Sequence, residues 1–320
     1  FRKIKKQVLI LMKNKRLTVI IIGLPLFAER LQKNLEKFYT EGKFIHLNTY
    51  YSKWDKIRSL WLIPKADLVF SINGSITQSK VFDLTLKHNI PFIMNWVGTD
   101  VLRAIEAHKN KSFNSDYVQK AIHYCEVSWI QEELKPIGIN AVVQNFASFD
   151  NQFYIRENRN KKFTVLNYIA DEKPEFYGIK EYLELAKLLP NINFLIAGTK
   201  GEKFYPLPQN VQALGWVKNM DEVFSKVHVC MRIPEHDGLS TYILESLARG
   251  KQVIYKYKFE HCFQASTSEE AAMILDRLYL QFVEGEKLDN NAGKEFVEKN
   301  FNSQVILGQL IHNFKSISGK

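Results

Sequence analysis

The order of apolar and amphipathic segments is the feature that most constrains how this chain can fold. Short apolar runs, among them Leu17–Ile22, Ala66–Ile72 and Ile90–Trp96, alternate with segments of helical spacing such as Glu29–Tyr39. Continuous apolar strands separated by helices are typical of a parallel sheet that is covered on both faces. The pattern therefore predicts a doubly wound α/β domain in the first half of the chain.

The alternation stops in a polar stretch and then begins again. Ser148–Lys162 has no apolar period, and after it Phe163–Ile169 has the pattern of a strand and Tyr177–Leu189 that of a helix. We expect an N-terminal domain over residues 1–150, a C-terminal domain over 151–302, and a final helix over 303–320 that packs back toward the N-terminal domain. The predicted fold class is α/β, with two doubly wound, Rossmann-like domains that face each other across a cleft. Ligands of such sheets bind outside the carboxyl ends of the strands.

Three further segments give definite local expectations. We expect a helix over Tyr117–Tyr124, followed by strands over Glu126–Ile130 and Ala141–Asn145. Near the end of the chain, Gly293–Ile317 is expected to be helical.

Positive charge is concentrated near the start of the chain. The net charge is +10; residues 1–150 carry 22 basic and 13 acidic side chains, and residues 151–320 carry 22 and 21. Residues 1–16 alone hold seven Lys and Arg and no acid, with Phe1, Ile4, Val8 and Leu11 at helical spacing between them. An apolar stripe beside a basic face is the pattern of a helix that lies on an anionic membrane. A solvated basic face is the alternative, and at this level both stay open.

Composition and missing motifs exclude several classes of protein. No apolar run approaches the roughly 18 residues of a membrane span. The three cysteines, Cys125, Cys230 and Cys262, are scattered, which fits reduced thiols in the cytoplasm better than disulfides. The chain has no G-x-G-x-x-G fingerprint, no phosphate-binding P-loop and no His or Cys pattern with metal-ligand spacing. We therefore expect no metal and no cofactor, and nucleic acid is an unlikely partner because no nucleic-acid-binding motif accompanies the charge.

The most informative stretch for chemistry is Arg232–Gly250. A predicted strand, Val227–Met231, leads into an acidic loop, and a helix begins near Ser240. The free N–H groups of a helix start form an anion site, and Asp237 and Glu245 could both reach a ligand bound there. Glu245 could instead form only a surface ion pair with Arg249, and Asp237 could be only an acid favoured near a helix start.

These residues resemble the acidic signature of the retaining glycosyltransferases of family 4, which have the GT-B fold. That signature has two acids with seven residues between them, within a glycine-containing loop and a helix that ends in Ala-x-Gly. Asp237 and Glu245 match the two acids, and Leu247–Ile254 matches the helix end and the next strand. Gly215-Trp216-Val217 is similar to the family's Gly-x-Val turn near the nucleotide base, and Gly98-Thr99-Asp100 resembles its Gly-Thr-Asp turn at the interdomain cleft. An ordinary turn in which Asp100 caps the next helix is the alternative for the last motif.

One departure concerns the donor diphosphate. The family usually places an Arg and a Lys after the first strand of the second domain, but here Tyr177 stands at the Lys position and no Arg precedes it. Arg232, Lys173 and Lys180 are the candidates to replace the pair. For Arg232, a structural salt bridge to Glu235 or Asp237 is the open alternative.

The resemblance implies a glycosyltransferase that moves a sugar from a nucleotide-sugar donor to an acceptor with retention of configuration and without metal. It implies a hexosyltransferase in the cytoplasm, with a glycan or a lipid-linked surface-polysaccharide intermediate as acceptor. Attachment at the inner face of the membrane through residues 1–16 is the associated hypothesis. The alternatives are an epimerase, phosphorylase or hydrolase on the same fold, or a non-catalytic basic nucleic-acid or scaffold protein.

The implied site residues fall into three groups. The expected catalytic residues are Asp237, Glu245 and Asp100. The expected donor-binding residues are Arg232, Lys173, Lys180, Gly238, Leu239, Ser240, Thr241, Trp216 and Val217. The expected acceptor-side residues are Gly23, Gly98 and Thr99.

Overall fold

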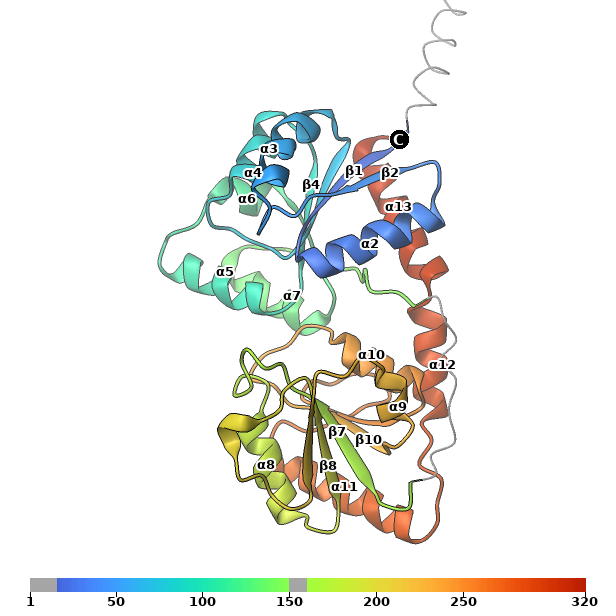
Figure 1. Cartoon of the computed structure of the whole chain (residues 1–320). Coiled ribbons are helices and arrows are strands. Elements are labelled where there is room, and N and C mark those ends of the chain that lie inside the picture. Colours follow the sequence, from blue (N-terminus) through green and yellow to red (C-terminus); the bar gives the residue numbers. More distant parts are fainter. Residues whose placement is uncertain (1–15, 150–159) are drawn as a thin grey trace, which may run out of the picture. The chain divides into compact units, whose positions relative to one another are not determined.

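The computed structural model describes residues 16–149 and 160–320 (Figure 1). The basic segment, apart from Arg16, and most of the expected linker lie outside these ranges. The chain divides into two compact units, the first formed by Phe1–Ser148 with Asn302–Lys320 and the second by Phe149–Phe301. All three cysteines are free thiols. No helix of the described ranges is long and apolar enough to span a bilayer.

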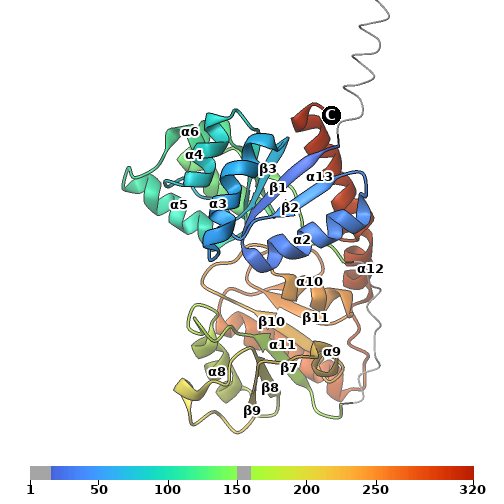
Figure 2. The same ribbon diagram turned by 45° about the horizontal axis from the view of Figure 1, so that its top comes forward.

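The first unit is a six-stranded parallel sheet with the strand order β2-β1-β3-β4-β5-β6 (Figure 2). Its strands are β1 (Thr18–Gly23), β2 (Lys43–His46), β3 (Leu68–Ile72), β4 (Phe92–Trp96), β5 (Ile122–Cys125) and β6 (Val142–Val143). Its helices are α2 (Pro25–Phe38), α3 (Lys53–Leu62), α4 (Lys80–Lys87), α5 (Thr99–Lys109), α6 (Ser115–Lys120), α7 (Ser128–Leu134) and α13 (Ser303–Ser318). Strands β3 and β4 are buried along their whole length, as the continuous apolar runs predicted.

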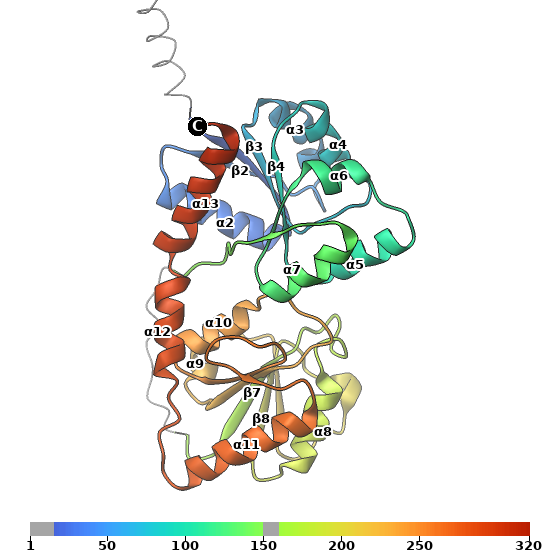
Figure 3. The same cartoon turned by 180° about the vertical axis from the view of Figure 1, so that it is seen from behind.

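The second unit repeats this architecture, with the strand order β12-β11-β10-β7-β8-β9. Figure 3 shows β7 and β8 with the helices of this unit around them. Its strands are β7 (Thr164–Tyr168), β8 (Asn193–Ala197), β9 (Val211–Gly215), β10 (Val229–Arg232), β11 (Gln252–Tyr255) and β12 (Phe263–Gln264). Its helices are α8 (Ile179–Leu188), α9 (Met220–Phe224), α10 (Thr241–Ala248), α11 (Ser268–Val283) and α12 (Asn291–Asn300). Two parallel, doubly wound sheets confirm the predicted fold class.

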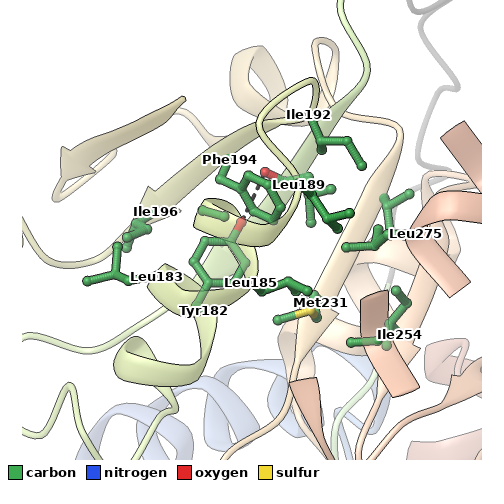
Figure 4. Packing of buried hydrophobic residues seen from close by; sticks show 14 of the residues in the cluster. Tyr182, Leu183, Leu185, Leu189, Ile192, Phe194, Ile196, Met231, Ile254 and Leu275 are labelled. Atoms are coloured by element: carbon green, nitrogen blue, oxygen red, sulfur yellow. Dashed lines mark hydrogen bonds between the residues drawn. The ribbon is translucent and has the colours of Figure 1, made fainter. Parts of the chain in front are cut away.

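The core of the second unit lies where α8 and α11 pack together over the sheet (Figure 4). Tyr182 of α8 is fully buried, and its hydroxyl donates to the backbone oxygens of Val165 and Leu195, 3.1 and 3.0 Å away. The ring packs edge-on against Phe194 of β8. A buried phenol with acceptors on two strands adds a polar constraint to an apolar core and thereby fixes how α8 lies on the sheet.

Two local predictions were wrong. Glu126–Ile130 is not a strand: the strand comes earlier, as β5, and α7 begins at Ser128. The predicted helix is correspondingly shorter and ends at Lys120. A short apolar run does not by itself distinguish a strand from a buried helical turn, which is why the two elements were exchanged.

The last helical segment is divided in two. Helix α12 ends at Asn300, and Asn302 caps α13 by accepting a hydrogen bond from the backbone N–H of Val305 at 3.0 Å. Helix α13 packs on α2 and β3 of the first unit, where Phe314 is fully buried with its ring centroid 5.3 Å from that of Phe70.

Candidate functional site

The second unit has a topological switch point between β7 and β10. From β7 the chain adds β8 and β9 on one side and then returns to place β10 on the other side. The loops that leave these two strands meet at their carboxyl ends: the N–H of Glu235 donates to the oxygen of Phe176 at 2.9 Å. Gly178 has φ of +78°, and a Cβ there would lie 2.6 Å from the oxygen of Ile233. Only glycine allows the two loops to approach this closely, at the place where sheets of this type bind ligands.

A buried ion pair joins the end of β10 to the acidic loop. The Nε of Arg232 donates to Oδ2 of Asp237 at 2.5 Å and its Nη2 to Oδ1 at 3.2 Å, with side-chain exposures of 9% and 14%. Burial opposes the charged guanidinium, but the carboxylate of Asp237 outweighs it and raises the pKa of Arg232. The guanidinium also lies over the ring of Tyr177, 5.1 Å from its centroid.

This geometry confirms the salt-bridge alternative for Arg232 and gives its partner as Asp237. Tyr177, at the position where the resemblance leads us to expect a Lys, thus has a cation over its ring. Contact of Arg232 with a diphosphate stays a prediction, as does a catalytic role for Asp237.

Side chains from β11 and the segment after it hold the acidic loop in place. The hydroxyl of Tyr255 donates to the oxygen of Gly238 at 2.6 Å, and the N–H of Asp237 donates to the hydroxyl of Tyr257 at 3.1 Å. Lys256 donates to the backbone oxygen of Pro234 at 3.0 Å. Because these partners fix the loop, the start of α10 keeps one position.

Helix α10 begins without a side-chain cap. Ser240 is its N-cap residue, in extended conformation, and its side chain makes no capping hydrogen bond. Its carbonyl accepts from the N–H groups of Ile243 and Leu244. Of the expected donor-binding residues before and at the helix start, Gly238 and Leu239 are buried, and Ser240 and Thr241 are half-buried. The first N–H groups of α10 are thus available to an anion, such as a phosphate.

Glu245 lies one turn into α10, half-buried, with 29% of its side chain exposed. Its carboxylate is 4.0 Å from Arg249, at the limit of an ion pair. Arg249 makes two shorter contacts, 3.0 and 2.7 Å, to Oδ1 of Asp221, and it lies over the ring of Phe224. The surface pair with Glu245 that the sequence suggested is therefore the weaker contact of Arg249.

A pocket of about 410 Å³ opens at the carboxyl ends of β7, β8 and β9. Its size is typical of sites for small molecules. It is lined by Asp171 and Pro174 after β7, by Gly198–Phe204 after β8, and by Gly215 and Trp216 at the end of β9 and just after it. Trp216 is 79% exposed, so its indole offers an aromatic face at the rim.

The polar groups of this pocket are ordered by Thr199. Its hydroxyl donates to Oδ1 of Asp171 at 2.5 Å and accepts from the N–H of Gly201 at 3.0 Å. Lys200 and Lys203 line the same pocket, together with the acids Asp171 and Glu202, so side chains of both charges stand near an aromatic ring. The sequence predicted Trp216 here, but it missed the segment after β8. The signal available was Gly198-Thr-Lys-Gly201, a glycine-bounded turn directly after an apolar strand.

The remaining donor-side predictions lie around this pocket. Lys173 is exposed and stands in sequence between the lining residues Asp171 and Pro174, and Val217 follows Trp216 and is half-buried. Lys180 is exposed in the first turn of α8. The structure thus brings Lys173, Trp216 and Val217 to the pocket loops, and it places Lys180 on the adjacent helix.

The acceptor-side predictions belong to the first unit. Its switch point lies between β1 and β3, where Gly23 has φ of +105° and a Cβ would lie 2.0 Å from the oxygen of Ile72. Gly98 is buried with φ of +149°, and Thr99 is exposed as the first residue of α5.

Asp100 is buried and organises the loops around this switch point. Its carboxylate accepts hydrogen bonds from the N–H groups of Gly74 and Gly98, both at 2.7 Å, and from those of Val97 and Val101 at 3.2 Å. Burial raises the pKa of Asp100, and these hydrogen bonds oppose that shift. The structure gives Asp100 the turn-organising role that was the open alternative, and its contact with an acceptor stays a prediction.

Metal ligands do not gather at either switch point. Within residues 16–149 and 160–320, no group of three or more His, Cys, Asp or Glu side chains is arranged to hold a metal ion.

Two parallel six-stranded Rossmann-like sheets, each doubly wound, define the GT-B class of folds, and known structures match the chain over nearly its full length. A glycosyltransferase from Rickettsia africae matches with a TM-score of 0.67 and 13% identity, covering 95% of this chain and 99% of that one. Anabaena HepE in complex with UDP and glucose matches with a TM-score of 0.64 and 11% identity, over 94% and 100%. Sucrose-phosphate synthase from Thermosynechococcus elongatus matches with a TM-score of 0.69 and 11% identity, over 95% and 100%.

At this level of identity the matches establish the GT-B fold alone. No family model and no curated protein sequence matches the chain.

Proposed function

We propose that this chain is a glycosyltransferase that binds a nucleotide-sugar donor at the carboxyl edge of the sheet in its second unit. The observation that carries the proposal is the pocket beside the switch point, with an exposed Trp216, two lysines and the uncapped start of α10 on one sheet edge. An aromatic face suits a nucleobase, and cations with free N–H groups suit a diphosphate. HepE, which shares the fold, was crystallised with UDP and glucose.

The chemistry asks for stabilisation of a departing nucleoside diphosphate. We assign this task to the N–H groups at the start of α10, aided by Lys200, Lys203 and Lys173. Arg232 is already neutralised by Asp237, so we assign this pair to positioning: it holds the acidic loop from which α10 starts. Glu245, half-buried one turn later, is the carboxylate proposed to contact the sugar.

The finer features are also part of the proposal. We infer retention of configuration, a hexosyl donor and metal-independent transfer from the resemblance around Asp237 and Glu245. The loops around Gly23, Gly98 and Thr99 are proposed to receive the acceptor, a glycan or lipid-linked intermediate of surface-polysaccharide synthesis. The proposed location is the cytoplasm, at the inner face of the membrane.

A ligand screen tests donor binding. Thermal unfolding is measured with UDP, GDP, ADP, CMP and their sugars, because a ligand at a hundred times its Kd stabilises the folded state by about 2.7 kcal/mol. We expect one nucleotide class to raise the Tm, and Trp216→Ala to weaken its binding about tenfold. Met273→Ala, which removes an exposed apolar side chain of α11 in the same unit, is the matched control and should leave binding unchanged. No shift with any nucleotide would contradict the proposal.

A reaction assay separates transfer from the other reactions of the fold. Release of nucleoside diphosphate is followed with and without added acceptor. Acceptor-dependent release supports a transferase, whereas equal release without acceptor indicates a hydrolase and conversion of the sugar without release indicates an epimerase. Glu245→Gln should then lower kcat/KM for the donor while the fold stays intact.

A further inference from the structure

Helix α3 in the first unit has its apolar side turned toward solvent. Trp54, Trp61, Leu60 and Ile57 are 68%, 69%, 57% and 49% exposed, whereas the one buried residue of the helix is Ser59. A surface helix ordinarily buries its apolar stripe and exposes its polar side. Large contiguous apolar patches on a soluble surface mark sites of interaction.

The exposed side of α3 also carries cations and no acid. Lys53 and Lys56 are exposed on it. Asp55, the single acid of the helix, is turned away: its Oδ1 accepts from Arg58 at 2.7 Å and its Oδ2 from the N–H of Asn48 at 3.1 Å. The α3 surface, defined as Lys53, Trp54, Lys56, Ile57, Leu60 and Trp61, is therefore both apolar and positive.

The chain just before α3 extends this surface with two tyrosines. Tyr51 is 81% exposed and Tyr50 45%, and their ring centroids lie 6.1 Å apart. Asn73 donates to the hydroxyl of Tyr50 at 3.0 Å, and Ser52 caps α3 by accepting from the N–H of Asp55 at 3.1 Å. The hydrogen bond from Asn73 and the capping of α3 thus hold the segment that carries the two tyrosine rings.

We propose that the α3 surface docks the first unit on an anionic lipid bilayer. Trp and Tyr rings favour the zone between lipid headgroups and acyl chains, and lysines keep their amines at the phosphates while their stems lie along the apolar surface. Each basic residue near such a surface contributes about 1 kcal/mol to binding, so Lys53 and Lys56 together strengthen it about thirtyfold. The apolar side chains supply the part of the binding that salt does not screen.

Charge favours a bilayer over another protein as the occupant of such a surface. A second copy of this chain would set lysine against lysine in a symmetric contact, between chains of net charge +10. Protein interfaces are enriched in aromatic residues but depleted of lysine. The inference names the surface that would give the membrane location proposed above, and it does not depend on donor binding, because the α3 surface and the donor pocket belong to different units.

Vesicle binding tests the docking surface in the full chain. Sedimentation is measured with vesicles of phosphatidylcholine alone and with vesicles that also contain phosphatidylglycerol. We expect binding to the anionic vesicles, and Trp54→Ser with Trp61→Ser should lower the partition coefficient at least tenfold. Met273→Ser with Leu280→Ser removes two similarly exposed apolar side chains of α11 and should change nothing. Equal losses in both double variants would overturn the proposal.

A charge variant and a depth readout sharpen the test. Lys53→Ala with Lys56→Ala should lower binding about thirtyfold, whereas Lys109→Ala with Lys111→Ala, two exposed lysines at and just after the end of α5, should lower it far less. Lipids brominated on the acyl chain should quench tryptophan fluorescence of the wild type, and Trp54→Phe with Trp61→Phe should bind but lose this quenching.

Other occupants give distinct results that would overturn the inference. If the α3 variants bind vesicles like the wild type and deletion of residues 1–15 abolishes binding, the basic segment alone is responsible. If the wild type binds no vesicles and the α3 variants change the oligomeric state, the surface joins two copies of the chain. Nucleotide binding, measured in parallel, should be the same in all α3 variants, so failure here is distinguishable from failure of the proposed function.

Discussion

The two units have the same doubly wound sheet, but the buried charges at their switch points are stabilised by different kinds of partner. In the first unit a lone carboxylate, Asp100, is buried and held by four backbone N–H groups. In the second unit a cation, Arg232, is buried and held by another side chain, Asp237. Each charged group has its partners within its own unit, so neither needs a ligand to provide them.

The two units also differ in where the groups that could bind a ligand or a surface are located. The second unit has its pocket one strand away from its ion pair, with Trp216 and Lys200 at the loops after β9 and β8. The first unit has its exposed aromatic and basic groups on α3. The same fold thus supports a pocket in one unit and an exposed apolar, basic helix surface in the other, because the loops and helix faces, and not the sheet, carry the specificity.

The largest expected effect concerns a feature that both units share, a glycine at the end of a strand that packs against a carbonyl oxygen of the neighbouring strand end. Gly23 in the first unit and Gly198 in the second each have φ above +100°, and a Cβ would lie 2.0 and 2.3 Å from a carbonyl oxygen of the neighbouring strand end. We expect Gly23→Ala to lower the free energy of unfolding of its unit by about 4 kcal/mol, and Gly198→Ala to do the same in the other unit. Urea unfolding measures both.

Gly285 is the matched control for the backbone conformation. It has φ of +83°, but no atom lies within 4 Å of where its Cβ would be. Gly285→Ala should therefore cost only about 1 kcal/mol, from the positive φ alone. An equal cost for Gly23→Ala would show that close approach of the strands is not what requires glycine.

The next effect compares the two buried charges. Asp237→Asn leaves the guanidinium of Arg232 buried without its counter-charge and should cost about 3 kcal/mol. Asp100→Asn removes a charge whose partners are neutral N–H groups and should cost about 2 kcal/mol. Adding Arg232→Met to Asp237→Asn removes the unpaired cation and should recover part of the lost free energy of unfolding. Asp100→Asn offers no such compensating change. The absence of coupling in this double-mutant cycle would argue against the ion pair.

Acid should destabilise the second unit through a buried histidine. The N–H of Thr164 donates to Nδ1 of His228 at 3.1 Å, so this nitrogen is unprotonated in the folded state. Burial, with nearby Lys251, lowers the pKa of His228 from 6.5 to about 4. The unfolded chain therefore binds the extra proton between about pH 6.5 and 4, and stability falls as the pH drops through that window, by about 3 kcal/mol at most.

The first unit offers the comparison for this pH effect. His123 of β5 also accepts at Nδ1, from the indole N–H of Trp96 at 3.1 Å, and burial lowers its pKa. We expect both units to lose stability on acidification, and His228→Phe to flatten the pH dependence of the second unit only. Stability curves measured from pH 7 to 4 decide this, and an unchanged slope in the variant would assign the acid effect to other groups.

The smallest effect compares two aspartates that anchor basic side chains. Asp67 accepts from the N–H of Thr18 at 2.8 Å and from Nζ of Lys320 at 2.9 Å, and its side chain is 12% exposed. Asp221, which pairs with Arg249, is 58% exposed. Asp67→Asn should cost about 1.5 kcal/mol and Asp221→Asn less than about 0.5 kcal/mol. Thermal unfolding at low and high salt checks the ranking, since only the exposed pair should be sensitive to screening.

The sequence was sufficient for the fold because the signal lies in long, repeated patterns. Ile20–Ile22, Val69–Ile72 and Phe194–Ile196 are apolar runs whose positions in the alternation define two doubly wound sheets. It failed over residues 117–130, where His123 interrupts the apolar pattern of a true strand and Trp129 with Ile130 imitates one. There the tertiary contacts of His123, and not its local propensity, decide the strand.

At the candidate site, the sequence predicted which residues are present more readily than which side chains pair with each other. The start of α10 follows from glycine and apolar spacing, whereas Trp216 was assigned to the donor site by the resemblance alone and its exposure was not predicted. The pairing of Arg232 with Asp237 depends on how a short loop folds, and sequence could offer it only as an alternative. Thr199 and Lys200 were missed because a glycine-bounded turn after a strand occurs in many α/β domains, so the local pattern does not indicate a pocket.

The first unit is discontinuous in the chain, and this has a consequence for biosynthesis. Residues 16–148 leave the ribosome before the second unit, but the face of β3 that Phe314 covers is closed only by α13, which is made after the whole of the second unit. At about 5–20 residues per second, the roughly 150 residues between them delay this closure by about eight to thirty seconds. During that time the second unit can finish folding while the first stays incomplete with an apolar groove exposed. Of the two units, the one that is translated earlier is therefore completed later.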